Sequence, residues 1–169
     1  MITEIGKKVQ TFYNKTPFPD YELDRFKDRE DLILNTYPFA RILDRSIPSD
    51  ASVIDAGCGT GQLAAFLSLR RKVTGIDFSE ASLNKAIKLK RKLKLNNLIL
   101  KQIDILDLKQ IKKLGKFDYV LCFGVLHHTG NAYQAFKNIL NLLKPGGKIA
   151  IGLYNKIGRI PLEIRRILA

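Results

Sequence analysis

Cysteines and long apolar runs are both scarce in this chain of 169 residues. Its two cysteines, Cys58 and Cys122, are too few for a disulfide framework or a zinc motif. The longest run without a charged residue, 119–136, contains two histidines, an asparagine and two glycines, which argues against a membrane span. No apolar stretch precedes a small-residue cleavage site near the N-terminus, so no signal peptide is expected. These absences favour a reduced, cytoplasmic protein with no transmembrane segment.

Acidic residues are also scarce, but only in the later part of the chain. Lys and Arg number 29 against 16 Asp and Glu, which gives a net charge of +13. Residues 1–50 hold 8 basic and 9 acidic residues, whereas Ala51–Ala169 holds 21 basic and 7 acidic ones, a net charge of +14. This asymmetry predicts either a surface that meets a polyanion, such as RNA or anionic lipid, or ordinary solvated helix faces in a lysine-rich protein.

Residues 1–50 have the pattern of a helical N-terminal segment. Ile2, Ile5, Val9 and Phe12 recur at helical spacing, and Pro17 ends that pattern. A second apolar set, Phe39, Ile42, Leu43 and Ile47, follows Pro38, a residue that suits the first turn of a helix. We expect this segment to form a cap or lid on a domain that spans residues 51–169.

From Ser52 onward, short apolar runs alternate with helical patterns. Strands are expected at 53–56, 73–77, 98–103, 119–123 and 148–153. Helices are expected between them at 61–70, 79–93, 107–114 and 131–143, the last stopped by Pro145-Gly146-Gly147. Strands that alternate with helices predict an α/β fold with a doubly wound, mostly parallel sheet.

The most informative motif is a glycine loop between the first expected strand and the first expected helix after it. Gly57, Gly59 and Gly61 allow a tight turn and a close approach of a ligand to the backbone, and the helix start at Gly61 favours an anionic group. Asp77 ends the next strand, where a carboxylate can accept hydrogen bonds from a ribose diol. Gln62 breaks the dinucleotide fingerprint, and no Gly-Lys-Ser/Thr follows to make a P-loop. The loop therefore predicts a nucleoside ligand with a small anionic end, and it disfavours a nicotinamide-linked oxidoreductase.

Five motifs in order resemble those of the class I S-adenosylmethionine-dependent methyltransferases. They are Asp55-Ala-Gly-Cys-Gly-Thr-Gly61, Gly75-Ile-Asp77-Phe-Ser, Gln102-Ile-Asp104-Ile-Leu, the run from Phe117 to His128, and Leu143-Lys-Pro-Gly-Gly-Lys148. The resemblance covers about Ser52 to Tyr154. It implies a Rossmann-like sheet with S-adenosylmethionine across the carboxyl ends of its strands, and S-adenosylhomocysteine as the product.

The resemblance also assigns residues to the two ends of that cofactor. Gly57, Cys58 and Gly59 would line the methionine part, and Asp55 would reach its amino group through water. Asp77 would hold the ribose hydroxyls.

Further positions follow the next two strands. Phe78 would pack on the adenine, with Asp104 accepting from its amino group and the Ile105 backbone beside it. Phe123 and Gly124 would flank the sulfonium.

Candidate catalytic residues come directly after the fourth expected strand. His127 or His128 could act as a general base, although neighbouring side chains point in different directions, so at most one faces the cleft and a two-histidine metal site is not expected. The alternative is a capping or packing histidine. Tyr13 and the Thr16-Pro-Phe-Pro-Asp20 turn could close over the cofactor as a lid, or could simply pack on the surface.

The acceptor is left open by the sequence. The Val125-Leu-His-His128 form resembles small-molecule methyltransferases of the quinone and natural-product type, and also enzymes that complete wobble-uridine side chains in transfer RNA. We expect a small-molecule acceptor. The alternatives are an RNA-modifying enzyme, which the +14 segment would suit, and a cofactor-binding domain of a longer protein without activity of its own.

The end of the chain departs from the resembled family, whose sheets continue through two further strands. This predicts either a fragment of a longer protein or an open sheet edge that a partner or second copy covers. Within the tail at 156–169, the residues after Pro161 suit a crossover helix on the sheet, or a helix lying on a membrane surface.

Overall fold

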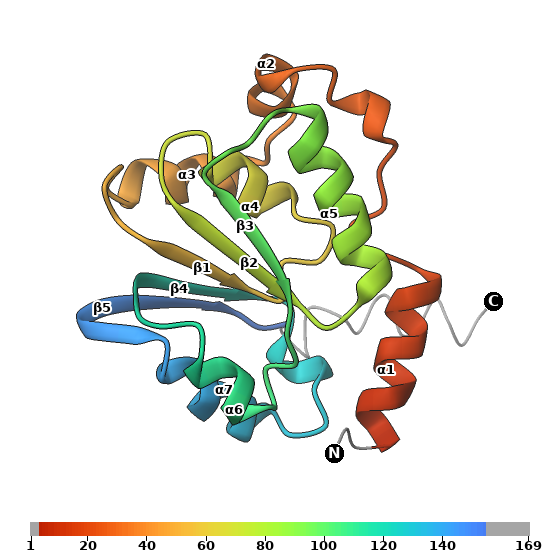
Figure 1. The fold of residues 1–169 in the computed structure, drawn as a ribbon, viewed down its shortest axis with the longest axis vertical. Helices are drawn as coiled ribbons and strands as arrows, with labels where there is room; N and C mark the ends of the chain where they lie inside the picture. Colours follow the sequence, from red (N-terminus) through yellow and green to blue (C-terminus); the bar gives the residue numbers. More distant parts are fainter. Residues whose placement is uncertain (1–3, 155–169) are drawn as a thin grey trace.

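A five-stranded parallel sheet forms the centre of the computed structural model, which describes residues 4–154 (Figure 1). The strands lie in the order β3-β2-β1-β4-β5, and every neighbouring pair is parallel. Their bounds are β1 Val53–Ala56, β2 Val73–Asp77, β3 Leu98–Gln102, β4 Phe117–Phe123 and β5 Leu143–Gly152. The reversal of strand order at β1 and β4 opens a crevice at their carboxyl ends, where ligands bind in folds of this kind.

Helices cover both faces of the sheet, which confirms the doubly wound α/β fold (Figure 1). One face carries α3 Pro38–Ser46, α4 Gln62–Leu67 and α5 Glu80–Lys92. The other carries α6 Leu108–Lys112 and α7 Ala132–Leu140. Ser79 caps α5 and Asp107 caps α6 through their side chains, as expected for residues that accept hydrogen bonds from a first helical turn.

The N-terminal segment contains α1 Glu4–Lys15, η1 Leu23–Arg25 and α2 Arg29–Leu34, followed by α3. Tyr21, Phe26 and Leu32 are buried in the same hydrophobic cluster as Leu67 and Leu89 of the sheet-covering helices. The segment before residue 50 therefore shares one core with the sheet. The apolar set expected after Pro38 is not buried throughout. Two of its members, Phe39 and Ile42, are exposed on the surface of α3.

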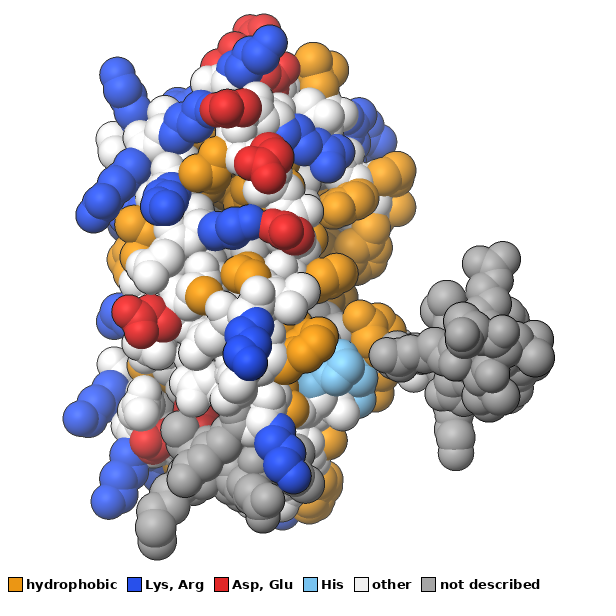
Figure 2. All heavy atoms as spheres, turned by 90° about the vertical axis from the view of Figure 1, so that its right-hand side faces the viewer, with side chains coloured by type: hydrophobic (Ala, Val, Ile, Leu, Met, Phe, Trp, Pro, Cys, Tyr) orange, Lys and Arg blue, Asp and Glu red, His pale blue; other side chains and the backbone are white. Residues whose placement is uncertain are grey.

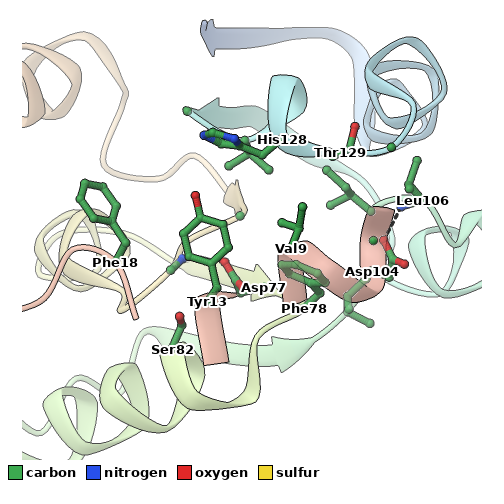
Figure 3. Close-up of a pocket in the computed structure, with 18 of the residues that line it drawn as sticks. Val9, Tyr13, Phe18, Asp77, Phe78, Ser82, Asp104, Leu106, His128 and Thr129 are labelled. Carbon is green, nitrogen blue, oxygen red and sulfur yellow. Dashed lines mark hydrogen bonds between the residues drawn. The ribbon is translucent and has the colours of Figure 1, made fainter. Parts of the chain in front are cut away.

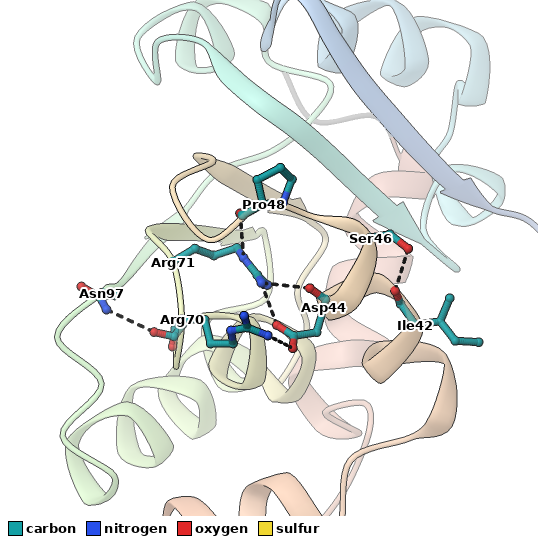
Figure 4. A network of polar contacts seen from close by, with 8 residues as sticks. Ile42, Asp44, Ser46, Pro48, Arg70, Arg71 and Asn97 are labelled. Carbon is teal, nitrogen blue, oxygen red and sulfur yellow. Dashed lines mark hydrogen bonds and ion pairs between the residues drawn. The ribbon is translucent and has the colours of Figure 1, made fainter.

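A buried arginine joins α3 to the start of β2 (Figure 4). The Arg71 guanidinium forms an ion pair of 2.7 Å with the Asp44 carboxylate and donates to the backbone oxygens of Asp44 and Pro48. Its side chain is 0% exposed. A charge that is fully removed from water needs such partners, so this contact fixes α3 against the amino ends of the strands.

The junction of α7 and β5 differs from the sequence prediction. The helix expected at 131–143 ends at Leu140, and Leu143 is instead the first residue of a strand expected only from 148. Leu143 pairs with Phe117, and a register shift between Phe117 and Tyr119 absorbs the intervening Pro-Gly-Gly turn. Pairing with β4 thus overrides the local apolar pattern.

Two expectations concern the edge of the sheet and the end of the chain. Within residues 4–154, β5 pairs only with β4, so an oligomer formed through this edge stays a prediction. The expected tail helix, and Ile2, lie outside the described residues. Among the helices that are described, none has the length and apolar character needed to cross a bilayer.

Candidate functional site

The glycine loop is fixed by the neighbouring strand and by the N-terminal segment. The backbone N–H groups of Gly57 and Cys58 both donate to the Ile76 carbonyl, at 2.8 and 2.9 Å. Gly59 has a φ of +54°, and a Cβ there would lie 2.3 Å from the Phe18 carbonyl oxygen. Thr60 completes this contact by donating through its hydroxyl to the Pro19 carbonyl at 2.7 Å. The glycine at position 59 is therefore required by the chain's own packing, in addition to any ligand.

Asp77 connects this loop to the turn that starts α5. One carboxylate oxygen accepts from the Gly59 N–H at 2.8 Å, and the other accepts from the Ser79 N–H at 2.9 Å. Burial raises the pKa of Asp77 above its usual value in spite of these hydrogen bonds. A carboxylate oxygen has a second lone pair, so Asp77 can still accept from a ligand hydroxyl.

A pocket opens at the carboxyl ends of the strands, above Asp77 (Figure 3). It is lined by residues from α1, the glycine loop and the turns after β2, β3 and β4. Of the expected site residues, it contains Tyr13, Gly57, Gly59, Asp77, Phe78, Asp104, Ile105, Phe123, Gly124 and His128. Four of the five sequence motifs are thus brought together in one cavity, whereas the Leu143–Lys148 motif contributes no residue to it.

Four expected site residues do not line this pocket. Cys58 is buried behind the loop, and Gly61 starts α4 with a φ of +81°. His127 lies outside the lining and packs on the Tyr154 ring at a centroid distance of 4.3 Å. Asp55 is 4% exposed.

Asp55 is an unusual group for a protein interior. Burial, and secondarily the charge of Asp77, raise the pKa of its carboxyl to about 7. None of the hydrogen bonds within residues 4–154 ends on this carboxylate. Within residues 4–154 its oxygens are not among the fully buried polar atoms that lack a partner, so they keep some contact with solvent, and this position can receive a cationic or hydrogen-bonding group from a ligand.

The turn after β3 forms a second polar wall. Asp104 accepts from the Leu106 N–H at 2.8 Å, which closes a local turn and leaves its other oxygen available (Figure 3). The buried Asn138 of α7 donates to the Ile105 carbonyl at 2.9 Å. The sequence does not predict this role of Asn138, because Asn138 is one polar residue on an otherwise apolar helix face.

Aromatic rings line the opposite side of the pocket. Tyr13 of α1 and His128 lie edge to face at a centroid distance of 6.2 Å, and His128 packs on Tyr154 at 5.6 Å. Phe18 also lines the cavity. On the face shown in Figure 2, hydrophobic side chains gather beside the histidines, whereas Lys and Arg are spread over the surface. This wall suits an uncharged or aromatic group.

Phe18, from the turn that could form part of a lid, lines the pocket, whereas several other lining residues are not indicated by the sequence, namely Gly6, Val9, Ser82, Ile103, Leu106, Val125, Thr129, Gly130 and Tyr154. Most are apolar or small, so their residue type carries no chemical signal. Leu106 and Val125 lie inside two of the motifs and Thr129 directly after one, so their positions could have indicated them, whereas Gly6 and Val9 reach the cavity only because α1 folds over it.

The fold and this site define a Rossmann-like protein with a pocket at the carboxyl ends of its parallel strands. Residues 47–166 match the family described as "Methyltransferase domain". The chain belongs to the class I S-adenosylmethionine-dependent methyltransferases.

Curated relatives and solved structures agree with this family. The chain is 33% identical to a ubiquinone biosynthesis O-methyltransferase of Acinetobacter baylyi over 105 residues, which cover 62% of this chain and 44% of the relative. PKMT2 from Rickettsia typhi in complex with AdoHcy is 31% identical, with a TM-score of 0.55 and coverage of 68% and 24%. A structure described as "Conversion of a Disulfide Bond into a Thioacetal Group during Echinomycin Biosynthesis" is 27% identical, with a TM-score of 0.67 and coverage of 78% and 57%.

The aligned region spans only part of these relatives. It covers 28% of an uncharacterized Synechococcus protein and 61% of an uncharacterized Rickettsia prowazekii protein.

Proposed function

We propose that this chain binds S-adenosylmethionine in the pocket at the carboxyl ends of its strands and that its methyl group passes to a small-molecule acceptor. The observation that carries the proposal is the position of Asp77, bonded to Gly59 at the base of the pocket. When bound, S-adenosylmethionine supplies an electrophilic methyl group on a sulfonium.

The residues of the pocket divide into an adenosine end and a methionine end. Asp77 would accept from the ribose hydroxyls, Phe78 would pack on the adenine, and Asp104, beside Ile105, would accept from the adenine amino group. The free lone pairs of Asp77 and Asp104 support these roles.

At the methionine end, Asp55 would reach the amino group through water, because it is an acid beside the glycine loop that does not itself line the pocket. Gly57, Cys58 and Gly59 would contribute backbone surface, since the N–H groups of the first two already bind Ile76. Gly61 would act indirectly by starting α4.

Phe123 and Gly124 would flank the reacting centre from the end of β4, and Tyr13 would close the pocket from α1. An acceptor hydroxyl that reaches this centre must lose a proton, and His128 is the histidine that lines the pocket and could take it. His127 is better suited to supporting His128, because their rings are in contact at a centroid distance of 4.1 Å. Positioning in a closed pocket supplies much of the remaining rate enhancement.

A small, largely uncharged acceptor is favoured by the aromatic wall and by the quinone O-methyltransferases among the relatives. RNA is the alternative that the +14 segment predicts. Two lysines of the most basic helix are already paired within the chain, Lys85 with Asp20 and Lys92 with Asp24. Two buried free cysteines are compatible with a cytoplasmic location, which we include in the proposal.

Calorimetry with S-adenosylhomocysteine and with NAD tests cofactor choice. We expect binding of the first only, and a loss of at least about tenfold in affinity for Asp77→Asn, because hydrogen bonds to a charged group each contribute about 1.5–3 kcal/mol. Asp107→Asn is the matched control, because the Asp107 carboxylate also accepts from backbone N–H groups beside a helix start but lies outside the pocket. Absence of S-adenosylhomocysteine binding by the folded chain would refute the proposal.

Transfer of a labelled methyl group into a cell extract then identifies the acceptor class. Label in the small-molecule fraction that survives nuclease treatment is expected. Label that nuclease releases from the macromolecular fraction would favour RNA instead.

A further inference from the structure

Two side-chain amides of α1 hold the turn between β2 and α5. Gln10 donates from Nε2 to the Phe78 carbonyl at 3.1 Å. One helical turn later, the Asn14 side-chain oxygen accepts from the Ser79 hydroxyl at 2.9 Å. Residues four apart share one face of a helix, so both contacts form together when α1 lies along this turn.

The same turn carries the proposed adenosine-binding groups. The Ser79 N–H donates to Asp77, and the Ser79 hydroxyl accepts from the Ser82 N–H at 3.2 Å, which caps α5. The Phe78 carbonyl also accepts from Gln102 of β3 at 3.2 Å. Amides from two separate elements thus fix the backbone on which the Asp77 carboxylate and the Phe78 ring are presented to the pocket.

The same helix covers the pocket. Val9 and Tyr13 line the cavity, and in the described part of the chain α1 makes its main contact with α5 (Figures 1 and 3). Gln10 and Asn14 each lie one residue after these lining residues, so the residues that close the cavity and those that hold the turn alternate along one helix.

We propose that Gln10 and Asn14 are positioning residues that couple closure of α1 to adenosine binding. They hold the 77–79 turn in the shape that presents Asp77 and Phe78 to the ligand. A ligand bound against this turn then keeps α1 closed over the pocket. This inference rests on the proposed function of the pocket. Coupling between two sites is reciprocal, so the factor by which the closed helix strengthens ligand binding is the factor by which ligand stabilises the closed helix.

Calorimetry with S-adenosylhomocysteine on the 169-residue chain tests the first half of this coupling. Gln10→Ala and Asn14→Ala are each expected to weaken binding about threefold to tenfold, the equivalent of one lost hydrogen bond. The double variant should lose more. Thr11→Ala is the matched control, because Thr11 is exposed on the same helix and is expected to stay within about twofold of the wild type. Alanine is the best helix former, so none of these changes weakens α1 itself.

Conservative variants separate positioning from mere packing. Asn14→Asp keeps an acceptor for the Ser79 hydroxyl and should retain most of the affinity. Gln10→Glu keeps the length of the side chain but, when ionised, has no donor for the Phe78 carbonyl, so it should bind as weakly as Gln10→Ala.

Amide hydrogen exchange over residues 4–15 tests the second half. In the wild type, S-adenosylhomocysteine should slow exchange of α1, and in the double variant this slowing should largely disappear. Wild-type binding combined with double-variant affinity equal to that of Thr11→Ala would overturn the coupling, as would α1 exchange that ligand leaves unchanged. A wild-type chain that binds no S-adenosylhomocysteine would instead overturn the proposed function itself.

Discussion

The Phe18 carbonyl oxygen occupies the space into which a side chain on Gly59 would project, 2.3 Å from the position of a Cβ. This contact joins the N-terminal turn to the centre of the glycine loop, and the Thr60 N–H donates to the same carbonyl at 3.3 Å. The loop that would receive the cofactor is therefore shaped on one side by residues that precede the sheet.

We predict that Gly59→Ala is strongly destabilising. A positive φ costs an alanine about 1–2 kcal/mol, and displacement of the Phe18 backbone adds a packing cost of about 1–3 kcal/mol. Gly115→Ala is the matched control, because Gly115 has a φ of +83° with nothing within 4 Å of its Cβ position. The free energies of unfolding, measured in urea, should differ by the packing cost. Equal losses of unfolding free energy in the two variants would show that the turn containing Phe18 moves aside without a packing cost.

The Arg71–Asp44 ion pair predicts a second large effect. Asp44→Ala leaves a guanidinium with 0% exposure without its carboxylate partner, and removal of one partner of a buried pair costs about 3–5 kcal/mol. Arg70→Ala removes the other, 58% exposed, partner of Asp44 and should cost at most about 1 kcal/mol. Chemical denaturation of both variants checks the contrast (Figure 4). Similar costs would mean that Arg71 finds water or another partner when Asp44 is removed.

The sheet could be predicted from sequence because its central strands are buried on both faces. The observed bounds of β1 and β2 are those expected from the sequence, and the helix expected at 79–93 begins beside its capping residue Ser79. The glycine loop and Asp77 were recognisable for a related reason, since strand ends and tight turns demand particular residue types.

The contacts of the N-terminal segment could not be predicted in this way. The hydrogen bond from Gln10 to the Phe78 carbonyl joins residues 68 positions apart, and an amide on a helix has no local signature of such a partner. Phe39 and Ile42 resembled core residues by spacing, yet they are exposed on α3. Which helix face is covered depends on tertiary packing, which a single periodic pattern does not encode.

The two histidines are expected to differ in their effect on methyl transfer. His128 lines the pocket, so His128→Ala should reduce transfer of label at neutral pH by about 10²–10⁴-fold if it acts as the base. The rate of this variant should rise with pH as the acceptor ionises in solution, while affinity for S-adenosylhomocysteine stays within a few fold. His127→Ala should reduce transfer less, because its ring lies outside the lining. A His128→Ala variant as active at neutral pH as at high pH would exclude the base role.

Asp55 predicts a pH-dependent stability in the absence of ligand. Its pKa in the folded chain is about 7, against a usual value of 3.8, so the folded state binds the proton more tightly than the unfolded state does. The associated stabilisation is fully present below the unfolded pKa and is lost as the pH rises to about 7. The loss reaches about 4 kcal/mol, at 1.36 kcal/mol for each unit of pKa difference.

Asp55→Asn removes this titration with little change of shape. At pH 8, where the native carboxyl is ionised, the variant should be more stable than the wild type by a few kcal/mol, and the gain should shrink as the pH falls toward 4. Urea unfolding of both proteins at several pH values measures the difference. The same variant should bind S-adenosylhomocysteine more weakly, because an amide cannot offer a charged partner to an amino group. A stability difference independent of pH would mean that Asp55 ionises at its ordinary pKa, and the buried acid would then not be reserved for a ligand.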